Sequence, residues 1–266
     1  VYKRQDIVSC DSRQFYKELK IGTSPPSHSQ LKHVKHHFIH HKSIHDKYNV
    51  GKYEKDAIKV INNLFKEKDV LILVGGSGLY ADSIMFGIDN FPEIPLDTRN
   101  NIIGSFKSEG IEALQDKLKK LDPEYYKEVD LSNYKRIIRA LEVIELTGEK
   151  FSSQRTNKEK QRVFQSHVMI IKSDRDKLYK RINDRVEIMI KEGLEEEAFK
   201  LKDFKELNTL NTVGYKEFFN YFDDKFTYTQ AVEKIKQNTR NYAKRQITWL
   251  KTVSYTHLTL PTTGIV

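Results

Sequence analysis

Hydrophobic and polar positions follow each other in blocks that predict an α/β core. Two short apolar runs, at 6–10 and 69–74, have the length and the β-branched content of buried strands. Between them, residues 52–66 carry isoleucine and leucine at helical spacing with charged residues elsewhere, which predicts an amphipathic helix. A strand, a helix and a second strand in this order predict two parallel strands joined by a crossover helix.

After the core, the pattern becomes helical over 92–163, with breaks at Gly110, Pro123 and Gly148. A strand-like run at 164–171 and further long helices follow it. We therefore expect a discontinuous α/β core that is interrupted by an inserted all-helical domain. The expected limits are 6–91 and 164–252 for the core and 92–163 for the insertion.

Both ends of the chain differ from the rest. Residues 1–5 begin without methionine, and residues 253–263 continue no helical or strand period from the helix before them. Each stretch resembles translated adapter sequence at the edge of a gene fragment. We expect residues 1–5 and 253–266 to be non-native flanks and leave them out of the fold prediction. The alternative is an ordinary frayed terminus.

The amino-acid composition indicates what kind of molecule the protein binds and in which cellular compartment it works. Lys and Arg number 46 against 37 Asp and Glu, and the resulting net charge of +9 favours a polyanionic partner. The single cysteine, Cys10, excludes a disulfide framework and a four-cysteine zinc site and indicates a reducing compartment. No apolar run approaches the roughly 20 residues that span a bilayer, and no signal-peptide pattern is present. We expect a cytoplasmic protein without a membrane partner.

Polar residues follow both predicted strands, where an α/β sheet places its ligand crevice. Asp11 begins a polar turn after the first strand, and Ser77 lies in a glycine turn after the second. We expect the two turns to lie near each other. A carboxylate in such a crevice can act as a general base, which contributes roughly 10²–10⁴ in rate. The alternatives are an aspartate that bonds its own backbone and a plain strand-to-helix turn.

Six of the nine histidines lie between His33 and His45, and pairs such as His37 and His41 have helical spacing. The pattern invites a metal site. The segment reads as a loop, however, and offers no cysteine and only one nearby acid, Asp46. We expect a surface loop near the substrate channel and no metal site.

Five motifs stand in the order and spacing seen in tRNA dimethylallyltransferases, also called tRNA isopentenyltransferases. They are DSRQFY with IGT at 11–23, VGGSGLY at 74–80, RIIRALEV at 136–143, VGYKE at 213–217 and RNYAKRQITW at 240–249. The resemblance implies a P-loop NTPase-like parallel sheet. It also implies transfer of a dimethylallyl group from its diphosphate to the exocyclic amine of the adenosine 3′ of the tRNA anticodon.

The resemblance also implies the roles of individual residues. Asp11 is the catalytic base, and Ser77 is the donor to the departing diphosphate. This chain departs from the family at two positions, because most relatives have threonine at 77 and some have arginine where this chain has Asn211. The implied diphosphate contacts are Gly75, Gly76, Ser77 and Asn211. The implied tRNA contacts are Asp11, Ser12, Arg13, Gln14, Arg99, Lys135, Arg136, Ile137, Ile138, Arg139, Arg240 and Lys244.

Helical geometry separates a cationic face from an apolar face in two of these segments. In the predicted helix 133–147 the cationic face carries Lys135, Arg136 and Arg139, and the opposite face carries Ile137, Leu141 and Ile144. In the last helix the cationic stripe carries Lys236, Arg240, Lys244 and Lys251. Both faces fit phosphate contact, and both also fit plain solvation.

The family opens with a strand and a Gly-x-x-x-x-Gly-Lys-Ser/Thr loop that cradles the diphosphate and magnesium. These 266 residues contain no such pattern. We interpret the chain as N-terminally truncated, without the first strand and the phosphate loop. We expect it to be nearly inactive and poorly stable, because a core strand would lack a neighbour and its apolar face a cover. Mg²⁺ is implied only through that loop.

Two other functions remain open. A nucleotide kinase or an adenylate dimethylallyltransferase could use the same core, although a small nucleotide needs no insertion with a cationic helix. A tRNA-binding fragment without chemistry would keep the basic helices and lack the phosphate loop. The expected partners are tRNA and dimethylallyl diphosphate, and we expect a monomer.

Overall fold

The computed structural model describes residues 5–156, 158–252 and 258–261. The chain divides into two compact units, which we call the core unit (Val1–Met85 and Arg162–Val266) and the helical unit (Phe86–Gln161). The predicted insertion covers residues 92–163. The helical unit begins six residues before the start of that range and ends two residues before its end. In the described part of the chain, no helix is both long and apolar enough to cross a bilayer.

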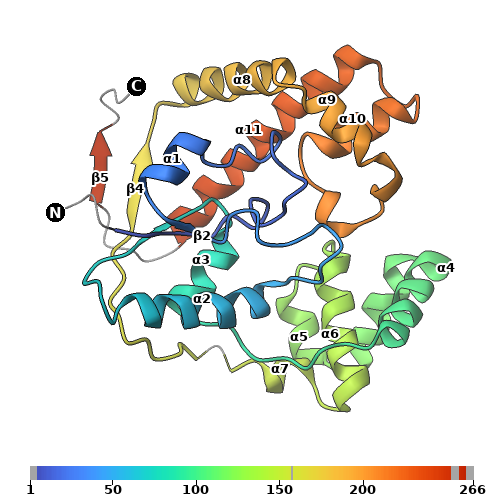
Figure 1. The fold of residues 1–266 in the computed structure, drawn as a ribbon. Coiled ribbons are helices and arrows are strands. Elements are labelled where there is room, and N and C mark those ends of the chain that lie inside the picture. Colours follow the sequence, from blue (N-terminus) through green and yellow to red (C-terminus); the bar gives the residue numbers. More distant parts are fainter. Residues whose placement is uncertain (1–4, 157, 253–257, 262–266) are drawn as a thin grey trace. The chain divides into compact units, whose positions relative to one another are not determined.

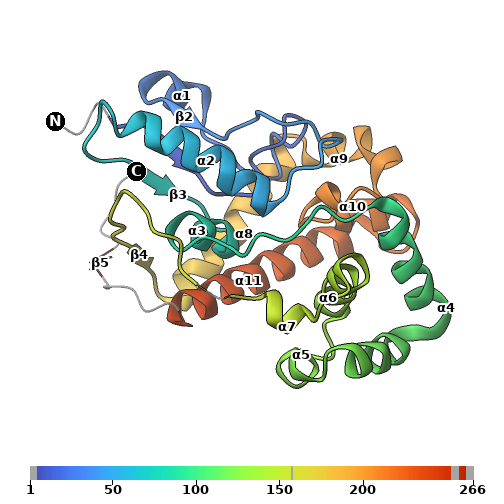
Figure 2. The same ribbon diagram turned by 90° about the horizontal axis from the view of Figure 1, so that it is seen from below.

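The core unit contains a three-stranded parallel sheet in the order β2-β1-β3. Strand β2 of this sheet is labelled in Figure 1, and β3 is labelled in Figure 2. The central strand, β1 (Ile7–Ser9), pairs with β2 (His36–His37) on one side and with β3 (Ile72–Val74) on the other. Val8 of β1 is buried at 1% exposure, as its β-branched side chain in a central strand predicts. The connection from β2 to β3 contains α2 (Val50–Leu64). The predicted parallel pair with an intervening helix is confirmed.

One face of α2 enters the core. Tyr53, Ala57 and Ile61 are buried and follow each other at four-residue spacing, which places them on one side of the helix. The helix begins where the Asn49 side chain accepts the Lys52 N–H, a standard N-cap bond. This buried face fixes the helix on the sheet, because the apolar area that it removes from water is the main term that favours docking.

The edge strand β3 leaves apolar side chains uncovered. Val70, Ile72 and Val74 are 54%, 38% and 51% exposed. We expected one core strand to lack a neighbour. The structure shows that β1 has neighbours on both sides and that β2 and β3 are the edge strands of this sheet. An open apolar edge is a site for unwanted pairing with another chain.

A second, two-stranded parallel sheet pairs β4 (Met169–Lys172) with β5 (Leu258–Pro261). The strand predicted at 164–171 therefore begins later than expected. The sequence pattern did not predict β5 within the expected C-terminal flank, because its Leu-Thr-Leu alternation is too short to stand out. The remaining residues of the expected flanks, apart from residue 5, lie outside the described part: 1–4, 253–257 and 262–266.

Helices build the rest of the core unit (Figure 2). They are α1 (His28–His33), α3 (Gly78–Met85), α8 (Arg175–Lys191), α9 (Leu194–Lys200), α10 (Tyr215–Phe222) and α11 (Tyr228–Thr252), with short 3-10 turns η2 (Lys202–Phe204) and η3 (Asn208–Leu210). The long helix α11 contacts α3, α8 and α10. Its Ile235 is buried in the same core as Phe218 of α10 and Val8 of the sheet. The C-terminal helix therefore reaches the sheet side of the unit.

The helical unit has a core of its own. It consists of α4 (Leu96–Leu121), α5 (Pro123–Glu128), α6 (Tyr134–Thr147) and α7 (Phe151–Gln154). The three sequence breaks act as predicted. Gly110 interrupts α4 with a φ of 83°, Pro123 opens α5, and Gly148 ends α6 in the left-handed region at a φ of 72°. A side chain is disfavoured at such φ values, which explains glycine at both positions.

Candidate active site

The carboxyl ends of β1 and β3 meet because the two strands pair in parallel. Ser9 stands opposite Val74, and the Cys10 N–H donates to the Val74 carbonyl oxygen at 2.7 Å. A polar turn follows each strand, and the turns carry Asp11 and Ser77. The prediction that these two turns lie near each other is confirmed.

Ser77 is held by groups from two directions. The Ser12 N–H donates to the Ser77 Oγ at 3.1 Å, and the hydroxyl oxygens of Ser12 and Ser77 lie 3.0 Å apart. From α11, the Tyr242 hydroxyl donates to the carbonyl oxygen of the preceding residue, Gly76, at 3.2 Å. A hydroxyl that its neighbours already orient needs little reorganisation before it donates to a developing anion.

The glycines of this turn allow α11 to approach closely. A Cβ on Gly78 would lie 2.5 Å from the Trp249 ring, and one on Gly76 would collide with the Gln246 amide. The Gln246 Nε2 donates to the Gly76 carbonyl oxygen at 2.9 Å. Gly75 meets the end of β1 equally closely. These glycines therefore allow α11 and the end of β1 to pack closely against the turn. This packing role is independent of any role in diphosphate binding.

Asp11 lies half-buried at the start of its turn. Its Oδ1 accepts the Arg13 N–H at 2.9 Å, which is the backbone-bonding role that the sequence left open. Burial raises the pKa of the Asp11 carboxyl, although the N–H groups of Arg13 and Gln14 and the charges of Arg13 and Arg185 oppose the rise. A carboxylate with a raised pKa is a stronger base, so the turn role and a catalytic role are compatible.

The Arg13 side chain ties this turn to a distant part of the chain. Its guanidinium donates to the carbonyl oxygens of Asn208, Thr209 and Asn211 at 3.3, 2.8 and 3.3 Å. Asn211, a predicted diphosphate contact, is therefore brought close to the Asp11 turn through its backbone. The donors of Arg13 are largely used inside the protein, whereas the sequence predicted that they contact tRNA.

A further set of bonds holds the segment after the turn. The Gln14 side-chain amide donates to the carbonyl oxygens of residues 23–24. The Glu197 carboxylate accepts the N–H groups of residues 20–22 and the Tyr215 hydroxyl. Sequence reasoning missed Glu197, because it stands in a run of three glutamates that looks like a solvated face. Tyr215 lies inside the VGYKE motif, which was the available signal.

Arg185 of α8 is a second residue that sequence reasoning missed. Its side chain is exposed, yet desolvation by the surrounding protein lowers the pKa of its guanidinium while Asp11 raises it. The charges of Arg185 and Asp11 therefore act on each other. Nothing in the local sequence distinguishes it, because α8 carries several other arginines and lysines with the same spacing.

In the helical unit, some of the predicted RNA contacts are exposed to solvent, and others are bonded to a carboxylate of the same unit. Lys135 and Arg136 are exposed. Arg99 donates to the buried Glu142 carboxylate at 2.7 and 3.2 Å, and Arg139 reaches the same carboxylate at 3.4 Å. Two predicted contacts need correction: Ile137 and Ile138. Both isoleucines are buried in the core of the unit, so their side chains cannot reach an RNA from this position.

Two predicted contacts lie on α11. Arg240 donates to the Asn183 side-chain oxygen at 2.7 Å, so it links α11 to α8. Lys244 is exposed and lies close to Tyr179 of α8. Of this pair, Lys244 is the one whose ammonium group faces solvent.

The histidine segment was expected to be a loop, and the structure corrects this for two of its residues, which pair with the central strand β1. His36 and His37 make up β2, and the His37 Nε2 lies 2.7 Å from the Asp6 carboxylate. His41 packs edge-on against aromatic rings, including those of Phe15 and Tyr48. Among the residues that the structure describes, no group of three His, Cys, Asp or Glu side chains could hold a metal ion.

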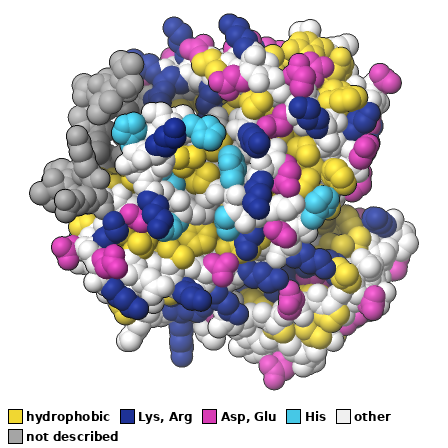
Figure 3. All heavy atoms as spheres, viewed as in Figure 1, with side chains coloured by type: hydrophobic (Ala, Val, Ile, Leu, Met, Phe, Trp, Pro, Cys, Tyr) yellow, Lys and Arg dark blue, Asp and Glu magenta, His cyan; other side chains and the backbone are white. Residues whose placement is uncertain are grey.

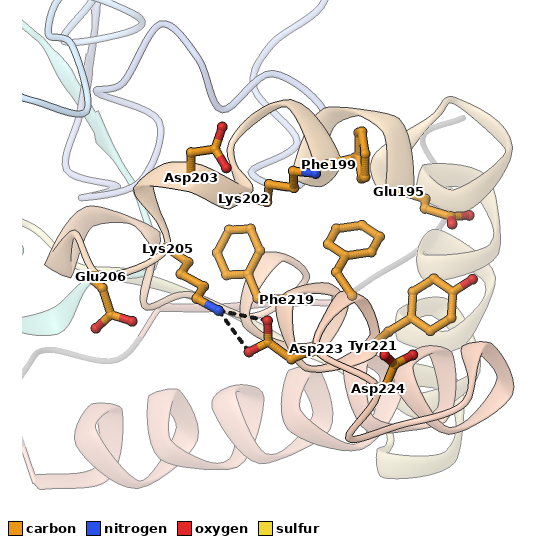
Figure 4. Close-up of a pocket in the computed structure, with 11 residues that line it drawn as sticks. Glu195, Phe199, Lys202, Asp203, Lys205, Glu206, Phe219, Tyr221, Asp223 and Asp224 are labelled. Carbon is orange, nitrogen blue, oxygen red and sulfur yellow. Dashed lines mark hydrogen bonds and ion pairs between the residues drawn. The ribbon is translucent and has the colours of Figure 1, made fainter.

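A separate hollow of about 650 Å³ lies between α9 and α10 (Figure 4). Phe199 and Phe219 point into it, and Lys205 spans one side by bonding both oxygens of Asp223 at 2.7 and 2.8 Å. None of the residues predicted for catalysis lines it. The hollow is therefore no part of the candidate active site.

The parallel sheet with polar turns at its carboxyl edge, together with the helical unit, fits an α/β fold of the P-loop NTPase-like class. The chain belongs to the IPP transferase family, whose model matches residues 14–253. It is 49% identical over 246 residues to the tRNA dimethylallyltransferase of Christiangramia forsetii, with 92% of this chain and 82% of the relative covered. The tRNA dimethylallyltransferase of Flavobacterium johnsoniae is 48% identical over 252 residues, with the same coverage.

Solved structures agree with this assignment. The full-length tRNA isopentenylpyrophosphate transferase of Bacillus halodurans superposes with a TM-score of 0.67 at 32% identity, and the match covers 98% of this chain and 83% of that one. A eukaryotic dimethylallyltransferase that acts on tRNA gives a TM-score of 0.76 at 22% identity, over 97% of this chain and 68% of that one. The second likeness shows the fold alone.

Proposed function

We propose that this transferase moves the dimethylallyl group of dimethylallyl diphosphate onto the exocyclic amine of the adenosine 3′ of the anticodon in tRNA. The names of the relatives support tRNA and a prenyl diphosphate as substrates. The single observation that carries the chemistry is the meeting of the two turns, in which the Ser12 N–H on the Asp11 side bonds the Ser77 hydroxyl.

The reaction needs a base and a donor. The lone pair of an adenine amine is delocalised into the ring, so the nitrogen is a poor nucleophile. Asp11 accepts a proton from this nitrogen as its bond to the allylic carbon forms. The carbon–oxygen bond of the diphosphate breaks at the same time, and the electron pair leaves on the phosphate oxygen. The Ser77 hydroxyl donates a hydrogen bond to that oxygen.

We also propose that Mg²⁺ accompanies the diphosphate. Mg²⁺ is usually held by one or two carboxylates together with substrate phosphates. The described residues form no metal cage of three or more His, Cys, Asp or Glu side chains. The ion would be held by a carboxylate together with the substrate diphosphate, and no step above is assigned to it.

Recognition of tRNA would use exposed cations. Lys135, Arg136 and Lys244 have ammonium or guanidinium groups that solvent reaches. An adenosine in an anticodon loop is unpaired, so its extrusion into a pocket costs less than extrusion from a duplex. We propose that the enzyme acts in the cytoplasm as a monomer.

The test compares the 266-residue chain with the same chain preceded by the N-terminal residues of the Christiangramia forsetii relative. We expect prenylated tRNA from the extended chain and far less from the chain alone, because these 266 residues contain no phosphate-loop pattern. Mass spectrometry of the digested tRNA measures the product. AMP is the second substrate, and a faster reaction on AMP than on tRNA would favour an adenylate dimethylallyltransferase.

Asp11→Asn in the extended chain tests the base. We expect kcat to fall by roughly 10²–10⁴, because the amide cannot accept the proton. Asp203→Asn is the matched control, since Asp203 is an exposed aspartate in η2. Unchanged turnover by the Asp11→Asn variant would refute the proposed chemistry.

A further inference from the structure

Backbone hydrogen bonds join a lysine-rich hollow to the segment that follows the Asp11 turn. We propose that this hollow binds the phosphate backbone of the RNA strand that presents the target adenosine. The inference rests on the proposed function, which supplies RNA as the partner. The hollow measures about 380 Å³ and is formed by the segment before α2 and the first turns of α2. Its lining residues are Lys42, Asp46, Lys47, Tyr48, Lys52, Lys55 and Asp56.

Positive charge exceeds negative charge in the hollow, and both acids have local partners. Asp46 accepts a backbone N–H of its own loop at 2.8 Å, and Asp56 accepts the Tyr48 hydroxyl at 3.0 Å. In the described part of the chain, no carboxylate lies within ion-pair distance of Lys47 or Lys55, and both lysines are exposed. Their ammonium groups are therefore available to an anion from solution.

Backbone hydrogen bonds connect the hollow to the catalytic turn. The Lys42 N–H donates to the Phe15 carbonyl oxygen, and the Lys17 N–H donates to the Lys42 carbonyl oxygen, each at 2.9 Å. The Tyr48 ring packs edge-on against the Phe15 ring with centroids 5.6 Å apart. Phe15 lies four residues after Asp11 in the sequence. These contacts hold the side of the hollow that contains Lys42 and Tyr48 against the segment after the Asp11 turn. Phosphate contacts made from such a position would set the register of the bound strand.

The surrounding surface extends the positive charge. Residues 17–55 contain eight lysines and three acidic residues, a net charge of +5 in a chain of +9. Figure 3 shows lysine and histidine side chains gathered over the face formed by α1, β2 and α2. A small anion would need one or two of these charges. An extended polyanion uses all of them, because each neutralised phosphate releases a condensed counterion.

The experiment measures binding by the chain as it is, without turnover. The probe is a fluorescently labelled anticodon stem-loop RNA with adenosine 3′ of the anticodon, and anisotropy gives Kd at several KCl concentrations. The variant is Lys47→Gln with Lys55→Gln. The matched control is Lys200→Gln with Lys216→Gln, two exposed lysines of α9 and α10 that form no ion pair in the described residues.

We expect the Kd of the hollow variant to rise about tenfold and the slope of log Kd against log salt to fall by about one to two. The control should stay within about twofold of the original chain. Equal Kd values and salt slopes for variant and control would overturn this inference and leave the proposed function standing. Failure of the unsubstituted chain to bind the RNA would overturn both. All four lysines are exposed, so thermal melting should show unchanged folding.

Discussion

The hydroxyl oxygens of Ser12 and Ser77 lie 3.0 Å apart although 65 positions separate the two residues. Parallel pairing of β1 with β3 produces this contact, because it brings the carboxyl ends of both strands to one edge of the sheet. Ser12 directly follows Asp11 in the sequence, and Ser77 belongs to the glycine turn. The geometry therefore joins a candidate base and a candidate donor in a single network.

Replacement of Ser77 tests the donor. In the extended chain, Ser77→Ala should lower kcat by about 10²–10³, because it removes the hydrogen bond to the departing oxygen. Ser77→Thr keeps the hydroxyl and should retain most of the activity. Initial rates of tRNA prenylation at saturating substrate measure both variants. An alanine variant as fast as the threonine variant would show that Ser77 is no donor.

His41 should make stability depend on pH. Burial among aromatic rings lowers the pKa of its imidazole to about 4, with the charge of Lys42 adding to the effect. Both ring nitrogens are buried without a hydrogen-bond partner. Protonation is therefore easier in the unfolded chain, so the free energy of unfolding decreases as pH falls from 6.5 toward about 4.

The His41→Phe variant checks this dependence. Between neutral pH and about pH 5, the original chain should lose on the order of 1 kcal/mol more than the variant, because the phenyl ring does not titrate. Urea unfolding at both pH values gives the two differences. A variant with the same pH dependence as the original chain would assign the effect to other groups.

Gly22 should not tolerate a side chain. A Cβ at this position would lie 2.6–2.8 Å from the Tyr215 ring, which Glu197 holds in place. Gly22→Ala should lower the free energy of unfolding by about 1–3 kcal/mol, as overpacking does. Gly104→Ala is the control, because nothing lies within 4 Å of a Cβ there and alanine favours the α4 helix by up to about 1 kcal/mol. Denaturant unfolding should shift the two variants in opposite directions.

The open edge of β3 should promote self-association. Ile72→Lys places a charge on that edge, which opposes pairing with another chain. We expect less aggregate in light scattering on mild heating. Leu96→Lys removes an exposed apolar residue from a helix instead and should change aggregation little. Equal improvement by both variants would indicate a general effect of charge.

The sequence predicted β1, β3, α2 and the proximity of the turns that carry Asp11 and Ser77, because these depend on local patterns and on parallel pairing. It missed β2, which is too short to show a strand pattern inside the histidine segment. The breaks at Gly110, Pro123 and Gly148 were predictable for the same reason, since φ restrictions act within a few residues.

The partners of charged side chains were not predictable. Arg99 faces the buried Glu142 of another helix, and Glu197 binds a backbone segment far away in the chain. Such pairs form only after the helices pack, and nothing in the spacing of charges separates them from solvated residues. Ile138 was misassigned for a related reason, because a family motif does not tell which of its members face the core.

The guanidinium group of Arg13 donates hydrogen bonds to the carbonyl oxygens of Asn208, Thr209 and Asn211. These hydrogen bonds join two segments that lie 195–198 residues apart in the sequence, so the two segments hold each other in position. An insertion or deletion in the segment after α9 would therefore disturb the turn that contains Asp11, although this segment belongs neither to β1 nor to the glycine turn. The length of that segment is therefore tied to the position of the Asp11 carboxylate, the candidate base.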